Sequence, residues 1–416
     1  MLMRSLSHRR VQQSGTYWWH AHASAQYSDG LIGALILHSP SDEYGFRASP
    51  SDTSRPANVS YDGDVIMVVN DMYNLFSSDW LSLYLNLQLG EGEGDEPTPD
   101  YGVINGVGQA NCDGAPARQS CVNSGNAGRY HNFTVEANQR YRVRVINAGS
   151  LASFDVSVDG HPLSVIEVDG TAVQPAPAAS VNVEVAQRTS FIIETNQTAG
   201  ACEYPELALA HVRSRILRAN IILAACPLVD WLRATVSEEM LAYDIPTERF
   251  DQRAIMYYAG TSSPTLPKES DAPTLQGLAT DFNTSALTPL EAITLPPSTK
   301  QAIVDIDFGS ASDGTFHAYF NNTAFGIPYA GYSTVLNVEN ATISKQAADY
   351  GGAFVVTVDE VEVFDLIINN HDDGAHPVSM SLMSPFARTS IWRAESDSPF
   401  HPFLSTRLAM NARRCT

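Results

Sequence analysis

Short runs of β-branched and aromatic residues, separated by turn-forming residues, recur along this chain. Within several runs apolar and polar residues alternate, as in the segment 141–147, YRVRVIN. This period of two is typical of half-buried strands in a β-sandwich. We therefore predict strands at 31–37, 64–69, 141–147, 154–160, 180–185, 190–195, 302–308, 318–322, 354–358 and 363–369.

Helical periodicity is scarce, and the two segments that show it best are 79–89 and 228–243. The predicted fold class is therefore all-β. A chain of 416 residues is long enough for two or three domains. Proline, serine and threonine crowd between residues 245 and 300, which predicts a boundary between two strand-rich blocks.

The charge of the chain excludes two classes of partner. Its formal net charge is -21, and its isoelectric point is near 4.8. Such a field repels polyphosphate and anionic lipid, so neither nucleic acid nor an anionic membrane surface is an expected partner. Small neutral or cationic substrates remain open. The sequence holds no apolar stretch of about 18 residues that could span a membrane, and residues 1–15 hold no signal peptide.

The pattern of asparagines and cysteines favours an oxidising compartment. Cys112 and Cys121 lie close together in a Gly-, Asn- and Ser-rich segment, so we expect a disulfide there, with a metal site as the alternative. Glycosylation sequons point to a secreted glycoprotein, whose N-terminal part we expect to precede residue 1. Their acceptors are Asn58, Asn132, Asn196, Asn283, Asn321 and Asn340.

The segment 15–40 carries the residues with the most chemical information. If 16–22 is a strand, His20 and His22 are two positions apart and point to the same face. Two imidazoles placed in this way can bind one metal ion or a close pair, and imidazole suits copper, zinc, iron and nickel. The alternative is a pair of polar side chains on the solvent-exposed face of a strand.

The surroundings of these histidines resemble a known motif. Gly-Thr-x-Trp-x-His-x-His, followed by the Asp29-Gly30 turn and an apolar strand, is similar to the second copper motif of multicopper oxidases. The resemblance implies that His20 and His22 bind the type 3 copper pair, one on each ion, where dioxygen binds. Segments 101–109 and 141–175 resemble the second cupredoxin domain of fungal laccase-like and iron-transport oxidases. That domain binds no copper, so we expect His161 to be a packing or turn residue.

The C-terminal part resembles the same family and then departs from it. Segment 363–377, VFDLIINNHDDGAHP, resembles the strand that leads into the family motif His-Pro-x-His-x-His-Gly. The resemblance implies that His376 binds the type 1 copper. The next two histidines of the motif are replaced by Ser379 and Ser381, which cannot substitute for imidazole on copper.

The resemblance implies tandem cupredoxin-like β-sandwich domains, the first and third of them incomplete. We expect a truncated first domain with its copper motif at 1–55, a second at 60–245, an incomplete third at 290–377, and a non-native tail at 378–416. Between QTAGA and WLRATV the family runs without a break, and the codons of Cys202 and Asp230 can encode splice junctions. We therefore interpret 202–230 as a retained intron, with a genuine insertion as the alternative.

The function implied by the resemblance is that of a laccase-like multicopper oxidase. Such an enzyme couples one-electron oxidation of a phenol or ferrous iron to reduction of dioxygen to water. The first and last copper motifs are missing from this chain, so we expect it to be catalytically incomplete as written. A non-enzymatic secreted β-sandwich glycoprotein that has lost its copper sites is the alternative, and a fragment without a stable fold is a third possibility.

Overall fold

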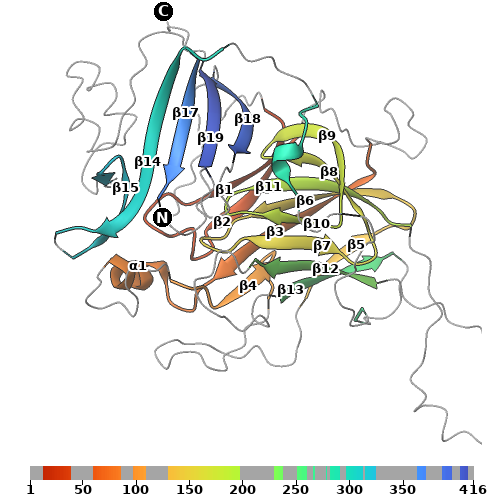
Figure 1. The fold of residues 1–416 in the computed structure, drawn as a ribbon. Coiled ribbons are helices and arrows are strands. Elements are labelled where there is room, and N and C mark those ends of the chain that lie inside the picture. The colour runs from red at the N-terminus through yellow and green to blue at the C-terminus, as the bar shows by residue number, and fades with distance from the viewer. Residues whose placement is uncertain are drawn as a thin grey trace, which may run out of the picture.

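The computed structural model describes most of the strand-rich segments. These are residues 13–38, 60–85, 97–108, 130–196, 229–237, 251–259, 266–267, 278, 282–290, 297–312, 314–324 and 363–371, together with the backbone of 387–395 and 403–410. Strands dominate them (Figure 1). No helix in these segments has the length and apolar character needed to cross a bilayer.

The first element is a two-stranded ribbon. Strand β1 (Gly15–His20) pairs antiparallel with β2 (Ile32–Leu37), from Gly15 opposite Leu37 to His20 opposite Ile32. Trp19 lies opposite Gly33, and a Cβ atom at position 33 would meet the Trp19 indole at 2.6 Å or less. The glycine therefore makes room for the indole on this face.

Two sheets that face each other follow the ribbon. One contains β3 (Gly63–Met72), β4 (Tyr101–Ile104), β6 (Arg140–Asn147), β8 (Leu163–Val168), β9 (Thr171–Ala178) and β11 (Arg188–Glu194) in the order β4-β3-β6-β11-β8-β9. The other contains β5 (His131–Val135), β7 (Phe154–Val158), β10 (Ser180–Val183), β12 (Val229–Val236) and β13 (Asp251–Tyr258) in the order β10-β7-β12-β13-β5.

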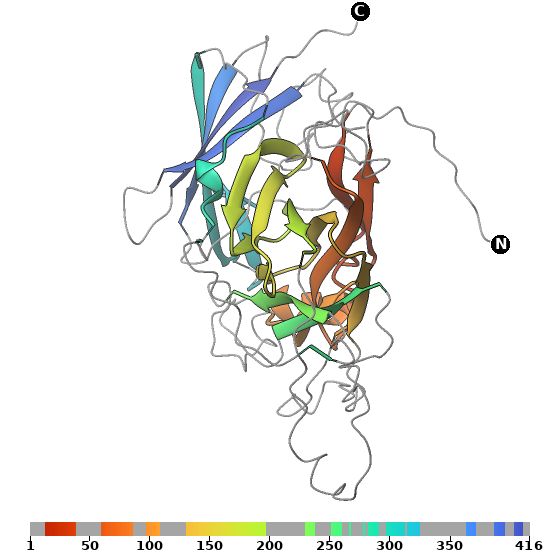
Figure 2. The ribbon, with the colours of Figure 1, turned by 90° about the vertical axis from the view of Figure 1, so that its right-hand side faces the viewer.

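Alternating side chains fill the space between these two sheets. Val143 and Val145 of β6, Phe154 of β7 and Phe191 of β11 are fully buried in one continuous apolar core. Burial of this much apolar surface is the main force that holds the sandwich together. In Figure 2 the red β1–β2 ribbon stands beside the strands of this sandwich.

A third sheet lies to one side of the sandwich (Figure 1). It contains β14 (Lys300–Ser310), β15 (Phe316–Phe320), β16 (Thr323–Ala324), β17 (Val363–Asn370), β18 (Ala387–Glu395) and β19 (Phe403–Met410), in the order β16-β15-β14-β17-β19-β18. Its buried apolar residues, among those described, are Val304, Ile306 and Ile368. The last two strands come from the tail 378–416, whose origin stays a prediction.

The all-β prediction is confirmed, with one local correction. Helix α1 (Ser77–Leu85) confirms the helix expected at 79–89, and η4 (Thr284–Ala286) is a single 3₁₀ turn. The helical pattern at 228–243 gives no helix at residues 229–236, which form β12 at the centre of a sheet. Leu232, Ala234 and Val236 point into the core at a period of two, and this packing overrides the local helical pattern. The strand expected at 354–358 lies outside the described residues.

Candidate metal centre

The two histidines of the copper-like motif lie next to each other. Strand β1 ends at His20, so His22 lies just beyond it rather than inside it. Their ring centroids are 4.3 Å apart and the rings are inclined by 31°. The backbone N–H of Ala21, between them, donates to Leu31 O at 3.0 Å, which prolongs the β1–β2 ladder. The expected common direction of the two imidazoles is therefore present, although the strand that carries it is shorter than predicted.

Aromatic rings hold the orientation of His20. The Trp18 ring stacks on it at 4.3 Å with an interplanar angle of 23°. Tyr27 meets it edge-on at 5.6 Å. Nδ1 of His20 lies 3.0 Å from the carbonyl oxygen of Ala21, so a proton on Nδ1 would leave Nε2 as the metal-binding nitrogen. In the described part of the chain, Nε2 of His20 and both ring nitrogens of His22 make no hydrogen bond.

The loop that follows the histidines is held at two points, by helix α1 and by a residue of the sandwich that follows the ribbon, which we call the second sandwich. Residues 23–30 form successive tight turns. The Asp29 carboxylate accepts hydrogen bonds from the backbone N–H and the hydroxyl of Ser77, both at 2.7 Å. Asp29 thus satisfies the amino end of α1 from outside the helix, where a negative charge is favourable. Ser28 and Ser150 share a hydrogen bond between their hydroxyls at 2.7 Å.

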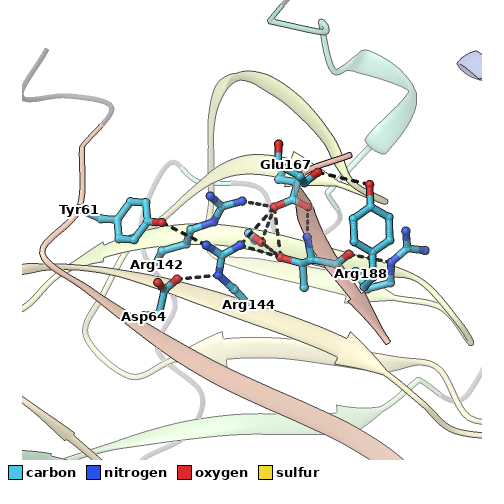
Figure 3. A network of polar contacts seen from close by, with 10 residues as sticks. Tyr61, Asp64, Arg142, Arg144, Glu167 and Arg188 are labelled. Carbon is cyan, nitrogen blue, oxygen red and sulfur yellow. Dashed lines mark hydrogen bonds and ion pairs between the residues drawn. The ribbon is translucent and has the colours of Figure 1, made fainter. Parts of the chain in front are cut away.

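Strand β1 itself is anchored through Thr16, which is fully buried. Its N–H donates to Glu167 Oε1 at 2.7 Å and its hydroxyl contacts Glu167 Oε2 at 3.2 Å. Its carbonyl oxygen accepts a hydrogen bond from Arg188 Nε at 3.0 Å. Figure 3 shows these contacts converging between the ribbon and the sandwich.

Charged side chains around Thr16 complete this network. Arg142 pairs with Glu167, and both side chains are almost completely buried. Arg144 donates to the hydroxyl of Thr16 at 3.0 Å and pairs with Asp64 at 2.6 Å. Burial disfavours the charged form of Arg144, but the charge and hydrogen bond of Asp64, together with the charges of Tyr61 and Glu167, outweigh it, and the pKa of Arg144 is raised. The buried charges are therefore compensated by partners, as buried charges must be.

Two glycines allow β1 to approach the sandwich this closely. A Cβ atom on Gly15 would lie 2.8 Å from Glu167 Oε1, and one on Gly170 would overlap the Tyr17 hydroxyl. Both glycines have positive φ angles, +131° and +79°. Burial, and then the negative charge of Glu167, raises the pKa of Tyr17, so its hydroxyl stays neutral in this contact.

The other histidines of interest differ from this pair. His161 is completely buried, as expected for a packing residue; Nδ1 lies 2.7 Å from Asp159 O and Nε2 lies 3.0 Å from the Tyr258 hydroxyl. His376, the expected type 1 ligand, lies outside the described residues. Across the described segments no three His, Cys, Asp or Glu side chains gather into a group that could hold a metal ion. His20 and His22 thus place two imidazoles, groups of the kind that copper accepts, side by side.

Comparison with known proteins finds matches to both the ribbon and the sandwich. Family models described as multicopper oxidase match residues 5–42 and 63–214, and the second match ends inside the segment 202–230. Laccase-4 of Thanatephorus cucumeris is 35% identical over 196 residues, which is 45% of this chain and 31% of that protein. The iron multicopper oxidase fer1 of Mycosarcoma maydis is 29% identical over 380 residues, 88% of this chain and 51% of that protein.

Solved structures show the same architecture. The structure of Fet3p, a multicopper oxidase that functions in iron import, has a TM-score of 0.63 at 17% identity, over 87% of this chain and 56% of that one. The laccase of Botrytis aclada has a TM-score of 0.60 at 19% identity, over 96% and 63%. The fold is that of tandem cupredoxin-like sandwiches.

One family model covers the ribbon that carries the histidines, and the other covers most of the sandwich. The chain belongs to the multicopper oxidase family. It spans between 31% and 51% of the length of the two relatives described above.

Proposed function

We propose that this chain carries part of the copper site of a laccase-like oxidase, with His20 and His22 as ligands of the type 3 copper pair and His376 as the type 1 ligand. The observation that carries the proposal is the juxtaposition of the His20 and His22 rings, 4.3 Å apart at the end of a strand. Copper bound there would supply the one-electron chemistry that side chains lack, coupling oxidation of a substrate to reduction of dioxygen to water.

The residues around the pair have defined tasks in this proposal. Trp18 fixes the plane of the His20 ring by stacking on it. The carbonyl of Ala21 selects the tautomer that presents Nε2. Asp29 holds the loop after the pair against α1. The protein thus contributes orientation before any metal arrives, which lowers the entropic cost of binding.

Phenols and ferrous iron are the proposed classes of reducing substrate. Relatives of both kinds match this chain, since one is named a laccase and another an iron multicopper oxidase. The net charge of -21 favours cations and neutral molecules over anions. We infer a secreted parent protein, because the sequon asparagines 132, 196 and 283 are exposed to solvent.

The chain as written is proposed to be catalytically incomplete. Ser379 and Ser381 stand where the family motif has histidines, and a serine hydroxyl is a poor ligand for copper. The domain limits proposed are those expected from the sequence, at 1–55, 60–245 and 290–377, with 378–416 as a non-native tail.

We also infer that 202–230 is a retained intron. The strand β12 crosses the end of this segment, and splicing would place a tyrosine at position 230, directly before the buried Trp231. Asp230 now stands there with its Oδ2 buried and without a hydrogen-bond partner in the described residues. Burial, and then the charge of Asp159, raises the pKa of Asp230 to about 7. A tyrosine ring would remove this buried carboxyl group.

Two proteins test the proposal when each is purified with copper present: the chain as written and the product of the fully spliced transcript. We expect the spliced product to be blue and to consume oxygen with a phenol or with ferrous iron, and the chain as written to do neither. If neither product binds copper, the alternative function, a secreted β-sandwich glycoprotein without copper, replaces this one. Sequencing of the cDNA across codons 195–240 tests the intron separately, since a transcript that uniformly keeps the segment contradicts it.

A further inference from the structure

We propose that Thr16 and Glu167 act as positioning residues for the histidine pair, so that the second sandwich, which carries no proposed copper ligand, sets the geometry of the copper site. This inference rests on the proposed copper role of His20 and His22. Glu167 lies on β8, 151 positions from Thr16 in the sequence. The link between them is a contact between two domains.

The contact fixes the strand that presents the histidines. Thr16 lies four positions before His20 on β1. Because the backbone between them is extended, fixing Thr16 also fixes the position of His20. Both backbone polar groups of Thr16 bond to the sandwich, the N–H to Glu167 and the carbonyl to Arg188. Its hydroxyl meets Glu167, Ser190 at 3.0 Å and Arg144. Translation or rotation of β1 would break these bonds together.

The contacts of Glu167 hold its carboxylate in one position, so that it can fix β1. Its side chain is 3% exposed and is held by Arg142 and by the hydroxyl of Ser190 at 3.0 Å. Charge-assisted hydrogen bonds of this kind are stronger than neutral ones and more restrictive in geometry. Glycine at positions 15 and 170 keeps the space between β1 and β8 closed. The carboxylate therefore stays in place whether or not β1 is loaded with metal.

A second anchor acts beyond the histidines. The bonds from Ser77 to Asp29 and between Ser28 and Ser150 hold the loop that follows His22. The histidine pair is thus fixed from both sides by the second sandwich and α1. Residues that hold metal ligands in place without touching the metal change metal affinity by about 10- to 100-fold.

The experiment uses four variants of the full chain. Thr16→Val keeps the shape of the side chain and removes its hydroxyl. Thr16→Ser keeps the hydroxyl and serves as the conservative rescue. Asp64→Asn breaks the pair with Arg144 on the side away from β1 and controls for general loosening of the network. Ser77→Ala removes one of the two bonds to Asp29 and tests the second anchor in a variant that leaves the buried network intact.

Two readouts separate this inference from the proposed function. The first is the nuclear Overhauser effect between the ring protons of His20 and His22 in metal-free protein. We expect it to be strong in wild type, Thr16→Ser and Asp64→Asn, and at least about threefold weaker in Thr16→Val. The second is the dissociation constant of Cu²⁺, which we expect to rise about tenfold in Thr16→Val and less in Ser77→Ala.

An unchanged Overhauser effect and an unchanged Cu²⁺ affinity in Thr16→Val would overturn the inference, whatever the thermal stability of that variant. If Thr16→Val does not fold, the same two readouts are taken on Thr16→Ala, which also lacks the hydroxyl, and unchanged values there overturn the inference instead. Equal decreases of the Overhauser effect and of the Cu²⁺ affinity in Thr16→Val and Asp64→Asn would also overturn it, because they would show a general loosening of the buried network. If wild type binds no Cu²⁺ while the Overhauser effect still responds to Thr16→Val, the positioning role stands and the proposed function fails.

Discussion

The end of β1 and the turn between β7 and β8 both carry histidine, in opposite surroundings. His20 and His22 lie side by side with part of each ring exposed. His161 is fully buried, and both of its nitrogens have partners in the protein. A histidine whose nitrogens are both occupied cannot also bind a metal. Hydrogen-bond occupancy and exposure, rather than the presence of histidine, therefore separate the proposed metal-binding region from the structural one.

The largest expected effect is on copper binding. Replacement of both His20 and His22 by alanine should weaken Cu²⁺ binding by at least about 100-fold, because the imidazoles themselves are lost and not only their support. His161→Ala should leave the Cu²⁺ affinity within about twofold of wild type. Isothermal titration of the three proteins checks both expectations. A loss of similar size in His161→Ala would erase the distinction between the two regions.

The next effect is on the free energy of unfolding. Here substitution in the β7–β8 turn should have the larger effect and substitution of the histidine pair the smaller one. His161→Ala removes a buried ring and its contacts with Asp159 and Tyr258, so the free energy of unfolding should fall by about 2 to 4 kcal/mol. The His20 and His22 variants should change it by less than about 0.5 kcal/mol. Denaturant unfolding measures both values, and a His161→Ala protein as stable as wild type contradicts the structural role.

Asp230 provides a further test near the β7–β8 turn. Burial makes the largest contribution to its raised pKa, and the charge of Asp159, which lies in that turn, raises it further. The folded-state pKa is about 7, above the ordinary aspartate pKa of 3.8. Ionisation therefore destabilises the fold, with a cost that is absent below about pH 4 and complete above about pH 7. Asp230→Asn should raise the free energy of unfolding at pH 8 by about 2 kcal/mol, allowing for partial exposure. No gain at pH 8 relative to pH 4 would contradict this.

The smallest expected effect is the pH dependence of stability that comes from the titration of His161. Burial lowers its pKa below 6.5, so the unfolded chain binds a proton that the folded protein rejects. The resulting stabilisation is present above pH 6.5 and is lost as the pH falls below that value. Compared with His161→Gln, wild type should lose on the order of 1 kcal/mol more between pH 7 and pH 5. Parallel stability curves for the two proteins would show that His161 does not titrate in this way.

The sequence predicts the elements of this protein better than the contacts between them. Alternation of apolar and polar residues locates strands such as β6 and β11, because each buries one face in the core. The spacing of His20 and His22 indicates a metal site. The helical pattern around β12 does not reveal the strand, because the central place of β12 in a sheet depends on neighbours far away in the sequence. The bond from Thr16 to Glu167 spans 151 positions and leaves no local signal.

The central claim is that His20 and His22 together bind copper. Pulsed electron paramagnetic resonance of the chain labelled with ¹⁵N-histidine and loaded with less than one equivalent of Cu²⁺, so that single paramagnetic ions are observed, tests it most directly against the variant in which both histidines are alanine. We expect imidazole nitrogen couplings from the ligand pair in wild type and their loss in the variant, while His161→Ala keeps them. Identical couplings in wild type and in the double variant would show that copper binds elsewhere, and would contradict the claim.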